Sequence, residues 1–320
     1  MAFLLSRGTA VAWLRANRQG DKTKERLGVP HHALEASRTR LKHHVSCFEG
    51  LPRPLHLTTW NREDRRRTAV TVCNSMSLPT GIYPSYLVER GVFCAAPELV
   101  FLQMANVLDD ERLRFLGFEL CGRYGIVGGK SHLCDQICTP GIISLFLDDC
   151  TGVHGRKKAA RVVRGVLGGA ASPMEAALAI CLVSPREVGG FGLPEPELNC
   201  SLPVKGSARK LWGTDSITSD LLWESVKLAI EYDSDEEHTA ENRITRDSVR
   251  RIVLEELGYR VLSVTNGMFS DPIQLERIAV VVASALGLEL PEAVDEEWVR
   301  QASFQRRIRD LAMHPERLLG

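Results

Sequence analysis

The sequence is long enough for two domains and has the composition of an ordinary soluble globular protein. Its 320 residues, 44% hydrophobic and 25% charged, exceed the size at which one hydrophobic core usually keeps growing. Lysine plus arginine equal aspartate plus glutamate at 40 each, so net charge neither favours nor excludes a polyanionic partner, and nine sparse cysteines exclude a secreted disulfide scaffold.

The N-terminal segment lacks the apolar core of a signal peptide. Arg7 interrupts it before about 7 to 15 apolar residues can accumulate. The longest apolar stretch, 278–288, falls well short of the roughly 20 residues needed to cross a bilayer. With reduced cysteines, these features predict a cytoplasmic protein that does not associate with a membrane.

Residues 1–168 are predicted to form an N-terminal α+β domain with a regulatory or DNA-binding role. The first 60 residues show no sustained hydrophobic period, and 1–70 contain 14 Lys or Arg against 6 Asp or Glu. Short basic runs such as 65–67 are either solvated surface or contacts to a polyanion. Further along, the patterns predict a strand at 69–72, extended segments over 83–93, and helices over 97–108, 109–123 and 140–168. The pair Gly168-Gly169 marks the domain boundary.

A second domain is predicted over 169–290, followed by a helical tail over 291–320. Its first helix is predicted from Ser172-Pro173-Met174-Glu175, which combines an N-cap serine, a proline at the first position and a glutamate three residues after the cap. Further patterns predict a helix from Thr239 to Gly258, a strand over 259–265 ended by Asn266-Gly267, and a long helix over 270–286. This order of helix, strands, helix, strand and helix predicts an α/β fold with a mixed sheet flanked by helices.

The stretch from Asp220 to Asp233 carries the most chemical information. A hairpin with its tip at Glu224-Ser225 and an even loop would sort the side chains by the two-residue period of a strand. One face is wholly apolar and comprises Leu221, Trp223, Val226, Leu228, Ile230 and Tyr232. The other comprises Asp220, Leu222, Lys227, Ala229, Glu231 and Asp233. The hairpin therefore gathers three carboxylates on one face.

Three neighbouring carboxylates repel one another unless something neutralises them. Mg²⁺ or Mn²⁺ bound by Asp220 and Asp233 would do so, and His238 would then be placed to transfer a proton. The alternative is that this face is the solvent-exposed side of an antiparallel pair. Glu175 has two interpretations as well, since it fits both a catalytic acid and a capping box.

The helix after Thr239 carries a basic stripe. Arg243, Arg246 and Arg250 lie on one side, opposite an apolar stripe of Val249, Ile252, Val253 and Leu257. The arginines are candidates for binding nucleic-acid phosphates, or they form an exposed basic face.

Several motifs of the second domain occur together in a known family. They are Ser172-Pro173-Met174-Glu175, Asp220, 228–233 with His238, Arg246-Asp247, and 257–265. Over roughly 170–287 they resemble an uncharacterised endonuclease-domain family related to the very-short-patch repair endonucleases of the PD-(D/E)xK superfamily. The resemblance implies a restriction-endonuclease-like fold with Glu175 as the first-helix acid, Asp220 as the metal-binding acid, Glu231 and Asp233 as the second acidic motif, and His238 as the catalytic histidine.

The N-terminal domain has a fainter resemblance of its own. Residues 70–168, through 96–102 and 119–124, are similar to a region that accompanies this domain in relatives of abortive-infection antitoxin regulators. Together the resemblances imply a Mg²⁺-dependent endonuclease, a hydrolase that cleaves DNA phosphodiester bonds. The alternatives are a catalytically inactive, nuclease-fold DNA-binding or antitoxin-like transcriptional regulator and a protein-interaction module.

Two departures from the family pattern keep these alternatives open. Asp233 stands where the superfamily has its catalytic lysine, so His238 would have to transfer the proton. Ser234 stands where a glycine commonly follows, and the acidic residues at 235–237 would repel DNA.

Overall fold

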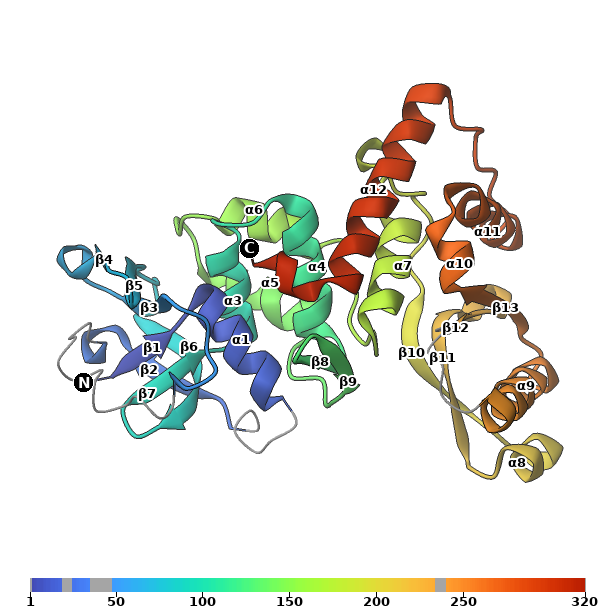
Figure 1. Ribbon diagram of the computed structural model, residues 1–320, viewed down its shortest axis with the longest axis horizontal. Helices are drawn as coiled ribbons and strands as arrows, with labels where there is room; N and C mark the ends of the chain where they lie inside the picture. The colour runs from blue at the N-terminus through green and yellow to red at the C-terminus, as the bar shows by residue number, and fades with distance from the viewer. Residues whose placement is uncertain (1, 19–24, 35–47, 234–239, 320) are drawn as a thin grey trace. The chain divides into compact units, whose positions relative to one another are not determined.

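The structure, a computed structural model, describes residues 2–18, 25–34, 48–233 and 240–319, and over 240–247 it describes the backbone alone. The chain divides into two units, Met1–Val166 with Glu316–Gly320, and Leu167–Pro315 (Figure 1). The expected boundary at Gly168-Gly169 lies just beyond this division. Each unit combines helices with a mixed sheet, so the predicted α/β class is confirmed. Within the described ranges no helix has the length and apolarity to cross a membrane.

A mixed sheet forms the centre of the N-terminal unit and has seven strands within the described residues. β7 pairs with β1 and β3 with β5 in parallel, and the other neighbours are antiparallel. In spatial order the strands are β2 (Leu27–Pro30), β6 (Ile82–Glu89), β7 (Val92–Ala95), β1 (Phe3–Leu5), β3 (Leu55–Thr59), β5 (Thr71–Ser75) and β4 (Arg66–Arg67). Three of these strands lie in the first 60 residues, where the sequence pattern gave no signal. β1 is buried along its whole length, and such a short strand shows no alternation.

Helices and a small hairpin complete this unit. They are α1 (Arg7–Asn17), α3 (Pro97–Met104), α4 (Asp110–Cys121), the hairpin β8 (Tyr124–Val127) and β9 (Lys130–Leu133), α5 (Pro140–Asp149) and α6 (Arg156–Val163). α3 begins at Pro97 as predicted, and the Asp109 side chain caps α4 by accepting from Arg112 N at 2.8 Å. The single helix expected over 140–168 is wrong, because Gly152 and Gly155 adopt positive φ and separate α5 from α6.

Arg18, the residue that follows α1, forms hydrogen bonds with the C-terminal end of α4. Arg18 is 4% exposed, and its guanidinium donates to the carbonyl oxygens of Glu119 at 2.6 Å, Tyr124 at 2.8 Å and Gly122 at 2.8 Å. The last carbonyls of a helix have no partner within it, so this side chain satisfies groups that would otherwise be buried without a donor.

We expect Arg18→Met to lower the free energy of unfolding by about 3 kcal/mol, because it removes a buried cation and leaves three carbonyls without its donors. Urea denaturation of the full chain would measure the change. Arg90→Met, at an exposed arginine in the turn between β6 and β7, is the matched control. Equal stability of the two variants would contradict this role for Arg18.

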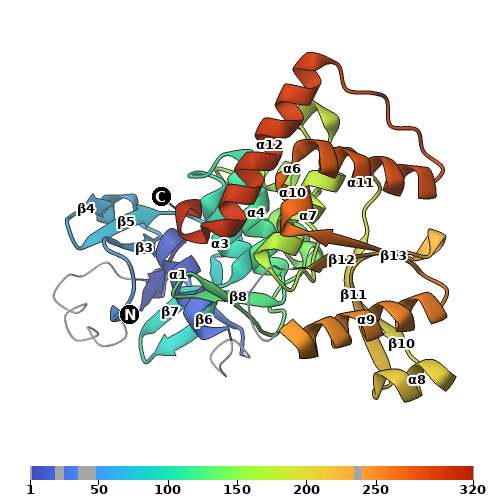
Figure 2. The same cartoon turned by 45° about the vertical axis from the view of Figure 1, so that its right-hand side comes forward.

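The second unit is built on a sheet of four strands, again counted over the described residues (Figure 2). Its order is β10 (Glu197–Pro203), β11 (Ser216–Trp223), β12 (Leu228–Asp233) and β13 (Arg260–Thr265). β11 pairs with β10 and with β12 in antiparallel orientation, and β13 pairs with β12 in parallel. The helices are α7 (Pro173–Val183), α8 (Gly206–Trp212), α9 (Ala240–Glu256), α10 (Asn266–Ser270), α11 (Pro272–Ala285) and α12 (Asp295–Met313).

The helix signals in this unit are largely confirmed. Ser172 Oγ accepts from Glu175 N at 3.1 Å and starts α7, and Asp271 caps α11. The strand β13 ends at Thr265, just before Asn266-Gly267 as predicted, and the Thr265 side chain accepts from Met268 N at 3.2 Å and starts α10 there. The residues expected to form a helical tail contain α12, which packs along α7 within this unit.

One face of the four-stranded sheet is covered by α8 and α9, which lie side by side (Figure 1). The core between them contains Leu222 and Ala229 from the sheet, and Ala208, Val253 and Leu254 from the helices. The opposite face holds Leu221, Leu228 and Ile230, which are also buried. Both faces of the hairpin are therefore inside the protein.

Candidate functional site

The register of β11 and β12 determines where the three carboxylates of the hairpin lie. Trp223 pairs with Leu228 and Leu221 with Ile230, so Asp220 stands opposite Glu231. The predicted sorting of the strand residues onto two faces is confirmed. The tip expected at Glu224-Ser225 is wrong by one residue, because η6 (Glu224–Val226) and Lys227, at φ 51°, form the connection.

The carboxylates do not lie on a solvent-facing surface. Glu231 is 7% exposed and Glu175 is 8% exposed, while Asp220 and Asp233 are half-buried. The alternative of a solvated strand face is therefore wrong. The reason is tertiary, because α8 and α9 cover this face through their contacts with Leu222 and Ala229.

Arg250, on α9, points into this group of acids. Its guanidinium donates to Asp220 Oδ1 at 3.2 Å, to Glu231 Oε2 and to the carbonyl of Thr218 at 2.7 Å. Asp220 Oδ2 also accepts from Tyr232 N at 2.8 Å. The guanidinium thus neutralises two of the carboxylates, a role that the sequence predicted for a metal ion. The alternative that Arg250 belongs to an exposed basic face is wrong.

Glu175 approaches the same group from the first turn of α7. Its Oε2 accepts from Ala171 N at 2.9 Å and from Asn199 Nδ2 at 2.6 Å. Ser172 makes its capping-box hydrogen bond to Glu175 N. The Glu175 carboxylate, however, accepts from Ala171 N and not from the N–H of the cap residue itself. Glu175 therefore both supports the helix start and belongs to the acidic group, so its two interpretations are compatible.

Asn199 is a member of the site that the sequence analysis missed. It lies on β10 between the pairs Leu198–Leu221 and Cys200–Ser219, at the position that faces Asp220. Its backbone adopts φ 48°, a left-handed conformation that asparagine tolerates better than most residues. An asparagine in an otherwise extended segment was the only signal, and it becomes informative only beside Asp220 and Glu175.

Burial and mutual repulsion shift the protonation of these acids. Burial, followed by the charge of Asp220, raises the pKa of both Glu175 and Glu231 to about 7. Burial also raises the pKa of Asp220, against the opposing effects of Arg250 and Tyr232 N, and the charge of Asp233 adds to the rise. One guanidinium thus faces more negative charge than it can balance, so the group retains protons or takes up a cation.

The remaining predicted residues are placed only in part. His238 and the acidic loop at 235–237 lie outside the described residues. Arg243 and Arg246 belong to α9, and their side chains are not described. Among the described residues no group of three or more His, Cys, Asp or Glu side chains stands ready to hold a metal ion.

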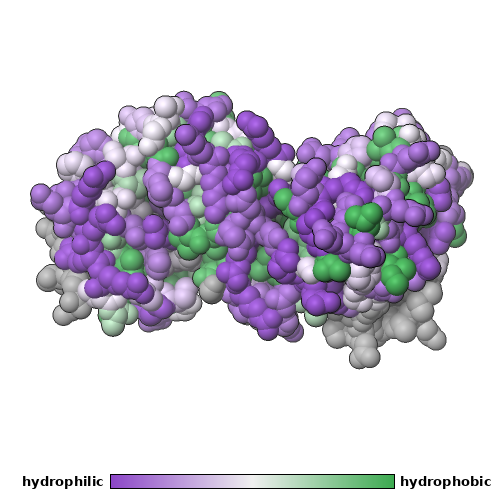
Figure 3. All heavy atoms as spheres, turned by 90° about the horizontal axis from the view of Figure 1, so that it is seen from above, coloured by the Kyte–Doolittle hydropathy of each residue, from purple (hydrophilic) through white to green (hydrophobic). Residues whose placement is uncertain are grey.

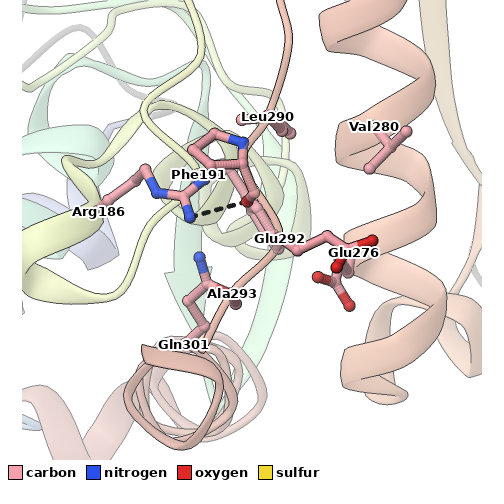
Figure 4. Close-up of a pocket in the computed structure, with 9 residues that line it drawn as sticks. Arg186, Phe191, Glu276, Val280, Leu290, Glu292, Ala293 and Gln301 are labelled. Atoms are coloured by element: carbon pink, nitrogen blue, oxygen red, sulfur yellow. Dashed lines mark hydrogen bonds between the residues drawn. The ribbon is translucent and has the colours of Figure 1, made fainter. Parts of the chain in front are cut away.

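A small cavity lies elsewhere in the second unit (Figure 4). It has a volume of about 50 Å³ and is lined by residues that include Arg186, Glu276, Glu292 and Gln301. The Arg186 guanidinium is occupied by the carboxylate of Glu297 at 2.7 Å and the carbonyl of Pro291 at 3.0 Å. None of the predicted site residues lines this cavity.

Comparisons with known proteins add sequence similarity without a function. Uncharacterized proteins from two strains of Mycobacterium tuberculosis are 31% identical to the chain over 97 residues. The match covers 30% of this chain and 31% of each relative, so the chain matches about a third of the length of these curated relatives. No family model matches the chain, and no solved structure matches it.

We expect Glu175→Gln to raise the melting temperature of the protein at pH 8 and to leave it unchanged at pH 5. A folded-state pKa raised from 4.5 to about 7 makes the free energy of unfolding fall as the pH rises between these values, and the loss is complete above pH 7. A neutral amide can accept the same two hydrogen bonds and should recover on the order of 2 kcal/mol at pH 8.

Thermal melts of the full chain at both pH values would test this expectation. Glu187→Gln, at an exposed glutamate of the same unit, is the control and should change neither melt. Destabilisation of Glu175→Gln by the same amount at pH 5 and pH 8 would mean that Glu175 is stably ionised.

Proposed function

We propose that the second unit is a metal-dependent endonuclease domain that hydrolyses DNA phosphodiester bonds. One observation carries the proposal: the buried carboxylates of Glu175 and Glu231 and the half-buried carboxylate of Asp220 come from α7, β12 and β11 and interact in one group, in which a single guanidinium pairs with Asp220 and Glu231. Buried like charges oppose folding, and strongly shifted pKa values are concentrated at functional sites. The mixed sheet flanked by helices fits the restriction-endonuclease-like fold that the resemblance implies.

The acidic residues have the right chemistry for Mg²⁺ or Mn²⁺. Asp220 and Asp233 would hold the ion, with Glu231 as a direct ligand or one acting through water, and hard divalent cations prefer such oxygen donors. Glu231 Oε1 is buried and has no hydrogen-bond partner, so it is open to a further interaction. When bound, the ion would supply an activated water and would neutralise charge on the phosphate.

The chain's own groups would handle protons and the DNA. With a pKa of about 7, Glu175 can gain or lose a proton at neutral pH, and we propose that it orients the attacking water or His238. We assign proton transfer to His238 by resemblance. Arg243 and Arg246 precede Arg250 on α9 and are proposed to contact phosphates. A cytoplasmic location accords with the described cysteines, which are all free.

We expect the full chain to nick supercoiled plasmid DNA in Mg²⁺ or Mn²⁺, and Asp220→Asn to slow nicking on the order of 100-fold or more. A metal-bound transition state is stabilised by several kcal/mol, and loss of an anionic ligand removes much of this stabilisation. Gel assays of the initial nicking rate would measure the change.

The matched control for this assay is Asp215→Asn, an identical substitution at an exposed aspartate just before β11, which should nick at the wild-type rate. Equal rates for wild type and Asp220→Asn would refute the proposed site.

A second function is favoured by one specific observation. Arg250 already neutralises Asp220 and Glu231 by direct ion pairs, so the fold can tolerate these acids without a metal. A nuclease fold of this kind could act as a DNA-binding or antitoxin-like regulator without catalysis. Its signature would be salt-sensitive DNA binding that is indifferent to Asp220→Asn, with no uptake of metal by calorimetry.

Arg250→Met separates the two functions. If the acids are metal ligands, removal of the competing guanidinium should make Mn²⁺ bind at least about tenfold more tightly at pH 7.5, because the uncompensated carboxylates then depend on the ion. Isothermal titration calorimetry would measure the affinity. Arg251→Met, at the exposed neighbour that pairs with Glu255, should bind Mn²⁺ as the wild type does. A variant at Arg250 that takes up no Mn²⁺ would favour the regulator.

A further inference from the structure

The N-terminus of α1 in the first unit has an uncompensated positive end. β1 lies inside the sheet and leads through the N-cap residue Ser6 directly into the 11-residue helix. The Ser6 side chain makes no capping hydrogen bond, and the first turn contains no acidic residue. The free N–H groups and the dipole at such a helix start favour an anion.

Two buried polar atoms beside this helix start have no hydrogen-bond partner. Ser6 is 0% exposed and its Oγ is unpaired, as is Nδ1 of His56 on β3. The two residues are adjacent, because Ser6 N donates to the carbonyl of His56 at 2.9 Å. Native proteins rarely leave such atoms unsatisfied, and a missing ligand is one of the reasons for exceptions.

Basic side chains from three elements converge on the same place. The strand register aligns Arg67 on β4 with Val72 on β5 and then with His56 on β3, so these side chains share one face of the sheet. Arg65, just before β4, and Arg67 are both exposed, and Arg7 is half-buried. Figure 3 shows a largely hydrophilic surface over the N-terminal unit on the face it presents.

The electrostatic effects among these residues agree with this placement. Burial and then the charge of Arg65 lower the pKa of Arg7, and burial, Arg7 and Arg67 lower the pKa of His56. The nearby acid Asp64 is engaged by the Thr59 hydroxyl at 3.3 Å. The positive charges therefore repel one another at the helix start, and an anion would relieve this repulsion.

The backbone at Arg7 is held in an unusual conformation. Its φ is 50°, which is uncommon for a residue with a β-carbon. Arg7 N donates to Gln103 Oε1 at 3.1 Å, and the buried Gln103 in turn donates to Thr58 Oγ1 at 3.0 Å. Strain that is stabilised by buried hydrogen bonds is typical of functional positions.

We propose that the first unit binds a phosphate group at the N-terminus of α1, held by the side chains of Arg7, Arg65 and Arg67 and by the backbone N–H groups of Gly8 and Thr9, because Gln103 already accepts from Arg7 N. Ser6 and His56 would supply further polar contacts. The phosphate belongs either to a nucleic-acid backbone or to a free phosphorylated small molecule. This site lies in the unit that does not contain the acidic group, so it is independent of the proposed nuclease activity.

The test uses the full chain in EDTA, so that no metal-dependent step contributes. Fluorescence anisotropy with a labelled DNA duplex, and thermal shift with inorganic pyrophosphate, would compare wild type with the double variant Arg65→Gln and Arg67→Gln. Both positions are exposed, so the variant should fold, and circular dichroism would verify this. Arg90→Gln, exposed in the turn between β6 and β7, is the control for loss of one surface charge.

If the phosphate is that of DNA, the double variant should bind the duplex at least about tenfold more weakly and with a shallower salt dependence, and pyrophosphate should compete with DNA in the wild type. If it belongs to a small molecule, pyrophosphate should raise the melting temperature of the wild type alone, with duplex binding equal in both proteins. Arg7→Gln should reproduce the loss in either case.

Identical duplex affinity together with identical pyrophosphate response in wild type and variants would overturn the proposal. Nicking requires a metal ion and this binding is measured in EDTA, so failure of the nuclease proposal and failure of this one give different results.

Discussion

Burial of several carboxylates around one guanidinium is the constraint on which the second unit depends. Asp220 and Glu231 stand opposite each other on β11 and β12, and Arg250 reaches both from α9. The first turn of α7 adds Glu175. Ionised carboxylates in a buried position destabilise the fold unless they are paired. The packing of α7, β11, β12 and α9 therefore depends on how the charges of these side chains are balanced. The pKa values near 7 express an imbalance that one arginine does not remove.

The two units face opposite electrostatic problems. In the second, acids outnumber the cation that neutralises them, whereas in the first, Arg7, Arg65 and Arg67 repel one another beside a helix start without an acidic residue. The equal totals of acidic and basic residues conceal this separation. A net charge close to zero therefore says little about partners when charges are segregated by folding. Both clusters would gain from a counter-ion, a cation in one unit and a phosphate in the other.

The proposed chemistry depends on which cation the acids accept. An arginine fixes two carboxylates by directional hydrogen bonds, while a divalent ion accepts their oxygens and retains water that can react. The same side chains can thus support a catalytic or a purely structural site. The similarity to uncharacterized mycobacterial proteins names no function, so the distinction between a catalytic and a structural site depends on the chemistry of these residues.

The sequence by itself determined the features that depend on near neighbours. The serine cap and first-position proline located the start of α7, and alternation over Asp220 to Asp233 sorted the hairpin faces, because these signals act within one turn or one strand pair. Only the tertiary structure decided that the acidic face is buried and that Asn199 joins the site. It also decided that Arg250 pairs with Asp220, which lies 30 residues earlier in the sequence. It also placed β1, which is too short to show a period, and β3, which is buried at four of its five positions and so does not alternate. Those outcomes depend on contacts between distant segments, and no local pattern encodes which segments will meet.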